Sequence, residues 1–143
     1  MRKVIAIAVL ALGLAGCSSM RTLYGNFVEN PEGLNQKEIA SDTVEKITEL
    51  YPPAKTRFEL KQPTPDAFGI ALVRGLRDRG YDVLLEIQSE ATKTHLPLRY
   101  VFDQFIDTNV YRVTIMIGNQ SLTRPYAQQS DGFVPVGYWV RKE

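Results

Sequence analysis

The chain has 143 residues, and its 17 Lys and Arg side chains nearly balance its 16 Asp and Glu side chains, which gives a formal net charge of +1 at pH 7. A chain this close to neutral lacks the basic excess that draws proteins to nucleic acid. Its single cysteine, Cys17, excludes an intrachain disulfide and a zinc site of several thiolates, so the fold depends on its hydrophobic core.

The N-terminus has the pattern of a bacterial lipoprotein signal peptide over residues 1–16. Arg2 and Lys3 form its positive end, and the apolar residues 4–14 are too few for a transmembrane helix, which needs about 20. Small residues stand directly before Cys17, as in a lipobox, where diacylglycerol is added to the thiol and the leader is cut before the cysteine. An ordinary signal peptide and an uncleaved anchor are the alternatives. We expect Cys17 to be lipidated, and Ser18 favours export to the periplasmic face of the outer membrane.

Residues 17–35 are expected to form the lipidated cysteine and an extended linker, and residues 36–143 a single periplasmic domain. Removal of the leader leaves 127 residues with a net charge of about −1. The linker is rich in Ser, Gly, Asn, Pro and Glu, which is typical of a spacer. Tyr24, Phe27 and Val28 are unusually apolar for such a segment. We therefore expect them to contact a partner.

The first predicted element of the domain is an amphipathic helix over residues 36–51. Its apolar residues recur at helical spacing and charged residues cover the other side. Asn35 is the expected N-cap, and Pro52 ends the helix because a proline disfavours helical geometry in the residue before it. Residues 55–61 then alternate as in a half-buried strand, with Phe58 and Leu60 on the buried face.

A second helix is predicted from Thr64, the expected N-cap, to Gly80, the expected left-handed C-terminal cap. Phe68 and Leu72 lie on its apolar face. Glycines at positions 69 and 75 cost about 1 kcal/mol each against alanine, which indicates close packing of this helix on a sheet. Residues 81–87 are expected to form the next strand.

The remaining residues predict a β-meander with strands near 98–106, 109–117, 120–127 and 134–140. Short turns of hairpin type separate the first three strands. The predicted order of elements is α-β-α-β-β-β-β. It indicates an α+β fold in which two helices pack on an antiparallel or mixed β-sheet.

No pattern of catalytic residues is evident in the sequence. His95, the only histidine, is expected to be a solvated loop residue, and partners for a metal site are absent. Asp103 and Asp107 would lie about 13 Å apart along one strand, too far to pair directly. The charged residues 74–79 are expected to form a solvated helix end. We therefore predict no enzymatic activity, no cofactor, no metal and no catalytic residue.

Aromatic residues are concentrated in the C-terminal half, where most are expected in the core. Trp139 falls out of phase with Val136, Tyr138 and Val140. If those three face inward, Trp139 faces outward, and an exposed Trp is a common interface anchor. Trp139 is therefore a candidate partner contact.

Several strings of the sequence resemble the TrbH family of conjugal transfer lipoproteins. Besides the lipobox, the resemblance rests on residues 24–28, 50–56, 62–69, 77–81 and 122–127. It implies a component of a type IV secretion apparatus for mating-pair formation. The implied partners are TrbG-like and TrbI-like core-complex proteins. Separately, the predicted α-β-α-β start resembles the N0 domain of secretins, which packs into rings. The resemblance carries no catalytic residues.

The sequence thus predicts an outer-membrane-anchored structural lipoprotein of a conjugative type IV secretion system, with copies gathered as a homo-oligomer. A periplasmic lipoprotein that binds peptidoglycan or a small ligand is the alternative. A large apolar pocket with convergent polar groups would favour that alternative.

Overall fold

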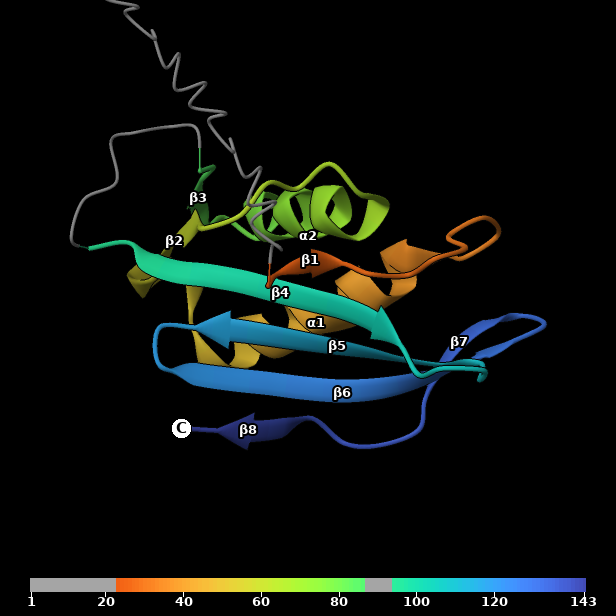
Figure 1. Cartoon of the computed structure of the whole chain (residues 1–143). Helices are drawn as coiled ribbons and strands as arrows, with labels where there is room; N and C mark the ends of the chain where they lie inside the picture. Colours follow the sequence, from red (N-terminus) through yellow and green to blue (C-terminus); the bar gives the residue numbers. More distant parts are fainter. Residues whose placement is uncertain (1–22, 87–93) are drawn as a thin grey trace, which may run out of the picture.

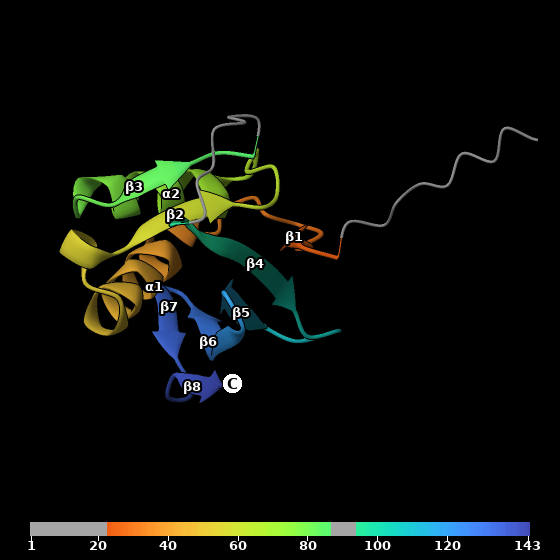
Figure 2. The ribbon, with the colours of Figure 1, turned by 90° about the vertical axis from the view of Figure 1, so that its left-hand side faces the viewer.

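The computed structural model describes residues 23–86 and 94–143, so the signal peptide and Cys17 lie outside the described residues. Two helices pack against each other and cover one face of a mixed sheet of eight strands (Figures 1 and 2). The α+β fold predicted from the sequence is confirmed. No helix within the described residues is both long and apolar enough to cross a membrane.

Both helices form where the apolar periodicity predicted them. Helix α1 spans Gln36–Leu50, and the prolines after Tyr51 lead into a short 3₁₀ turn, η1, at Pro53–Lys55. Helix α2 spans Ala67–Asp78, and its N-cap is Asp66, whose carboxylate accepts a hydrogen bond from the Gly69 N–H at 3.0 Å. The helix therefore begins two residues later than the expected cap at Thr64, because the carboxylate of Asp66 is in reach of that N–H.

Six strands of the sheet lie in the order β3-β2-β4-β5-β6-β7, the last of which is Gly132–Pro135. Its strands β2 and β3 run parallel to β4, whereas β4, β5 and β6 form the predicted antiparallel meander. These five strands span Arg57–Leu60 (β2), Asp82–Leu84 (β3), Leu96–Gln104 (β4), Val110–Ile117 (β5) and Gln120–Gln129 (β6).

Strand β1, Gly25–Asn26, lies in the segment expected to be an extended linker. It pairs in parallel with Val101 and Phe102 of β4, and the Phe27 N–H donates to the Phe102 carbonyl at 2.8 Å. Strand β2 pairs only with the first residues of the long strand β4, so the rest of that edge is open to β1. Residues 25–27 of this segment are thus hydrogen-bonded to the sheet.

The expected last strand, residues 134–140, is divided into two. Strands β7, Gly132–Pro135, and β8, Val140–Lys142, both pair with β6, one at each end of that ten-residue strand. The residues between them leave the sheet, and Gly137 lies against the ring of Pro125.

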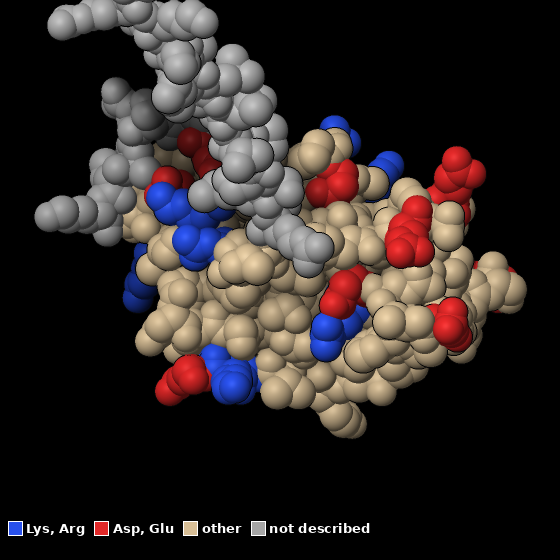
Figure 3. Space-filling model, viewed as in Figure 1, with Lys and Arg blue, Asp and Glu red and all other residues tan. Residues whose placement is uncertain are grey.

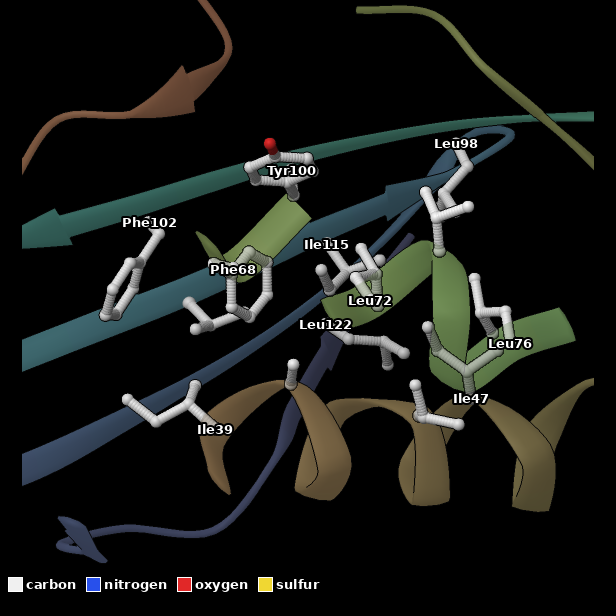
Figure 4. Close-up of a cluster of buried hydrophobic side chains, with 14 of the residues drawn as sticks. Ile39, Ile47, Phe68, Leu72, Leu76, Leu98, Tyr100, Phe102, Ile115 and Leu122 are labelled. Carbon is white, nitrogen blue, oxygen red and sulfur yellow. The ribbon is translucent and has the colours of Figure 1, made fainter. Parts of the chain in front are cut away.

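The core lies between the helices and the sheet (Figure 4). Phe58 and Leu60 are buried, as the alternation in residues 55–61 predicted. A β-carbon added at Gly69 would overlap the hydroxyl of Tyr100, and one added at Gly75 would come within 2.9 Å of Val44. The expected close packing of α2 is confirmed, against the sheet at Gly69 and against α1 at Gly75.

Candidate functional site

The N-terminal segment is fixed to the domain by a cluster of polar side chains around Asp66. Asn26 donates from its side-chain nitrogen to Asp66 at 3.1 Å and to Gln36 at 2.8 Å. The hydroxyl of Tyr100, a fully buried residue of β4, also donates to Asp66. One carboxylate thereby joins β1, the start of α2 and the centre of the sheet.

A second carboxylate, Asp42 of α1, joins the C-terminal half to the helices. Arg124 of β6 donates to both Asp42 oxygens at 2.9 and 3.1 Å, and the Tyr126 hydroxyl donates to the same carboxylate. Arg124 also donates from Nε to the Gly137 carbonyl at 2.9 Å. Its guanidinium carbon lies 5.9 Å from the centre of the Trp139 ring, within cation–π range.

The tyrosines of the two clusters, Tyr100 and Tyr126, are held in the neutral form. Burial raises the pKa of Tyr100 and of Tyr126 well above the ordinary value, and the neighbouring Asp66 or Asp42 carboxylate raises it further. A phenol that keeps its proton remains a hydrogen-bond donor to its carboxylate. The two clusters therefore stabilise the fold, and neither tyrosine is set up to act as a base.

The three linker residues expected at a partner contact have different surroundings. Phe27 is 48% exposed. Val28 packs against the core, and its N–H donates to the Asn26 side chain at 3.1 Å. Tyr24 lies under the Arg99 guanidinium, with 5.3 Å between the guanidinium carbon and the ring centre. Only Phe27 of the three presents a large exposed apolar surface.

The expected phase of the C-terminal strand is wrong. Trp139 is half-buried and packs against the core, whereas Val136, Tyr138 and Val140 are 53%, 90% and 63% exposed. The three residues do share one exposure, as the alternation predicts, but the chain leaves the sheet after Pro135, and they face solvent instead of the core. The exposed aromatic residue is thus Tyr138. We call Val136, Tyr138 and Val140 the C-terminal strip.

A further apolar surface lies at the turn between β4 and β5, which we call the tip and define as Phe105, Ile106 and Asp107. Ile106 is 88% and Phe105 44% exposed, and together with Phe27 and Glu29 they line a shallow hollow. Figure 3 shows that carboxylates predominate over this end of the molecule. Nothing in the sequence pattern marks the tip, because it looks like an ordinary hairpin turn.

The outer side of the helix layer carries a groove of about 590 Å³ between α1 and α2. Val44, Ala71 and Gly75 contribute small or buried apolar surface to it, and Ile70, 49% exposed, stands beside them. The remaining lining residues are Lys37, Ser41, Ala67, Arg74, Asp78 and Arg79. Those six are all exposed, so the polar groups stand at the rim.

The residues considered for chemistry do not form a catalytic arrangement. His95 differs from expectation, since its side chain is only 5% exposed and lies 3.3 Å from the Asp82 carboxylate. Asp103 pairs with Arg112. In residues 23–86 and 94–143, no group of three or more His, Cys, Asp and Glu side chains is arranged to hold a metal.

The charged end of α2 is exposed, as expected. Arg77 donates to the Val83 carbonyl at 2.8 Å, and no ion pair forms along this helix among the described residues. Two of its cations, Arg74 and Arg79, instead line the groove.

Comparison with known proteins identifies a family. The family model described as conjugal transfer protein TrbH matches residues 21–143, which include every described element of the fold. No curated protein and no solved structure matches the chain. The expected similarity to N0 domains therefore stays a prediction.

Proposed function

Because this chain belongs to the TrbH family of conjugal transfer proteins, we propose that it is an outer-membrane-anchored structural lipoprotein of a conjugative type IV secretion system. The match over residues 21–143 is the observation that carries the proposal. The family is a structural component of conjugal transfer and is not a known family of enzymes. The proposed role is to hold core-complex proteins, TrbG-like and TrbI-like, at the mating channel.

The fold supports a short tether. We propose that lipid on Cys17 anchors the chain at the periplasmic face of the outer membrane. Gly25, the first residue of β1, lies eight positions after Cys17. Fully extended, a segment of that length spans at most about 28 Å, so the sheet edge at β1 stays close to the membrane. A domain held at that distance is placed to support a complex embedded in the same membrane.

We propose that partner proteins contact Phe27 and the C-terminal strip. Of the residues expected at a contact, Phe27 has the exposed surface, while Tyr24 and Val28 hold the segment that carries it. Trp139 would act by supporting the neighbouring Tyr138. Exposed aromatic side chains are frequent hot spots of interfaces, each worth about 2 kcal/mol or more of binding free energy.

A detergent pull-down from donor cells, combined with mating frequency, tests this function. We expect TrbG-like and TrbI-like proteins to co-purify with the wild-type chain, and we expect Tyr138→Ser and Phe27→Ala to lower both capture and transfer. Glu45→Ala, an exposed change on α1, is the matched control. Normal transfer in a clean deletion strain, with no core-complex protein captured, would refute the channel role.

The alternative, a ligand- or peptidoglycan-binding lipoprotein, has one feature in its favour. The groove between α1 and α2 lies within the size range of small-molecule pockets. Its polar groups, however, stand on exposed side chains at the rim, whereas a small-ligand pocket has polar groups that converge inside. The groove therefore fits a protein surface better than a small ligand.

A further inference from the structure

The groove between α1 and α2 carries an excess of positive charge. Lys37, Arg74 and Arg79 line it, against the single carboxylate of Asp78. None of these three cations forms an ion pair with a described residue. Unpaired cations around an apolar floor are suited to a partner that brings both an apolar side chain and carboxylates.

The tip has the opposite character. Ile106 projects with 88% of its surface exposed, and the hollow beside it is lined by the carboxylates of Glu29 and Asp107 and by no cation. Neither carboxylate forms an ion pair with a described residue. A cation beside the tip, Arg112, lies over the Phe105 ring at 5.1 Å and is paired with Asp103, so the tip presents an apolar side chain beside two unpaired carboxylates.

The tip is also held in one conformation before any contact is made. The Phe105 N–H donates to the Val110 carbonyl at 2.9 Å, and the Thr108 hydroxyl donates to the Phe105 carbonyl at 2.9 Å. The Gln104 side chain donates to the Thr108 carbonyl at 2.7 Å. A surface fixed in this way loses little conformational entropy when it binds.

We propose that the chain associates with itself head to tail, the tip of one copy docking in the helix groove of the next. Ile106 enters the groove beside Ile70, and Asp107 and Glu29 face the cations at its rim. The two surfaces are different patches of the same chain, so the contact is heterologous and repeats from copy to copy into a ring or a filament. A shared membrane anchor raises the effective concentration of the copies.

The proposal deepens the structural role above by naming the surfaces that join the copies. Its test uses the purified mature lipoprotein in detergent, with self-association measured by sedimentation at low and high salt. We expect Asp107→Lys and Arg74→Glu each to weaken self-association at least tenfold. Asp131→Lys, which makes the same charge change on the turn between β6 and β7, is the matched control for the tip. Arg57→Glu, at an exposed position of β2, is the control for the groove.

Mixing the two variants gives the sharpest result. Each alone sets like charges against each other across the contact. In an equimolar mixture, the lysine introduced at position 107 of one variant would meet the glutamate introduced at position 74 of the other, and the native Asp107 would meet the native Arg74. We therefore expect the mixture, and the double variant Asp107→Lys with Arg74→Glu, to associate as the wild type does. Higher salt should weaken the wild-type association because the charges lie at an exposed rim.

Three results would overturn the proposal. They are a wild-type chain that stays monomeric at millimolar concentration, single variants that associate like their controls, and a mixture that fails to recover. If Arg74→Glu lowers capture of core-complex proteins while self-association is unchanged, the groove belongs to another protein and the contact between copies is wrong. None of these results bears on whether the chain is needed for plasmid transfer, so the two proposals can fail separately.

Discussion

Replacing Asp42 tests whether the second carboxylate cluster holds the two halves of the fold together. In Asp42→Ala, the Tyr126 hydroxyl loses its acceptor in a position where the residue is 2% exposed. Arg124 loses both bonds to the carboxylate but keeps its bond to the Gly137 carbonyl. The variant therefore removes the carboxylate acceptor of one buried donor and leaves one cation partly paired.

The expected loss of stability follows from these contacts. An unsatisfied buried hydroxyl costs about 1–3 kcal/mol. The side chains of Asp42 and Arg124 are 31% and 19% exposed, so solvent screening reduces the contribution of their ion pair to about 1 kcal/mol. Alanine recovers about 0.5 kcal/mol through its higher helix propensity. We expect a net loss of about 2.5 kcal/mol, a large share of the roughly 5–15 kcal/mol typical of a domain.

Urea unfolding of the mature chain, followed by circular dichroism, measures this loss. Tyr126→Phe alone should cost about 1 kcal/mol, because Asp42 keeps Arg124. Adding Tyr126→Phe to Asp42→Ala should cost little more than Asp42→Ala alone, since the two side chains act through one hydrogen bond. Glu45→Ala, on the same helix but exposed, is the control. An Asp42→Ala variant within about 0.5 kcal/mol of that control would refute the reasoning.

Three further predictions concern the anchor, the core and the pH dependence. Cys17→Ser should abolish palmitate labelling and leave the precursor in the inner membrane; labelling equal to wild type would contradict the lipobox. Leu72→Ala, fully buried on α2, should cost about 2–5 kcal/mol in urea unfolding, and an unchanged midpoint would place the core elsewhere. The free energy of unfolding should fall above about pH 10, by about 1.4 kcal/mol per tyrosine per pH unit. Above that pH a tyrosine of the unfolded chain loses its proton, whereas Tyr100 and Tyr126 of the folded chain keep theirs. Tyr100→Phe should make this fall shallower; an unaltered slope would show that the phenol does not stay protonated.

The parts of the fold predicted correctly are those coded by short repeating patterns. Helix α2 and the alternation of Tyr111, Val113 and Ile115 on β5 can each be recognised within a dozen residues. In both elements the buried side chains recur at the period of the helix or strand itself. Strand β1 has only two residues and exists because β4, far along the chain, offers an open edge. No local pattern contains that information.

The candidate contacts were harder to predict for a related reason. The alternation predicts Trp139 at the surface, but the chain leaves the sheet after Pro135, and the Trp139 ring lies near the guanidinium of Arg124. The hollow beside the tip and the helix groove each combine residues distant in sequence, such as Phe27 with Ile106 and Lys37 with Arg74. Such surfaces are visible only once the chain is folded.

The strings that carry the family resemblance supply much of the fold's polar framework. Asn26 comes from the first string, Asp66 from the one that opens α2, and Arg124 and Tyr126 from the string on β6. They belong to the two carboxylate clusters, whose other members, such as Asp42 and Tyr100, lie outside the strings. The tip, by contrast, lies outside all of these strings, and so does the C-terminal strip. The strings therefore mark part of the scaffold together with Phe27, whereas the tip and the C-terminal strip are exposed surfaces on which that scaffold does not depend. We therefore expect that exchanging the tip and the C-terminal strip between two such lipoproteins exchanges their partners. The free energy of unfolding in urea should change by no more than about 0.5 kcal/mol, as is usual for substitutions at exposed positions. If each lipoprotein keeps its original partners after this exchange, and changes them only when the cluster residues are exchanged, recognition depends on the clusters.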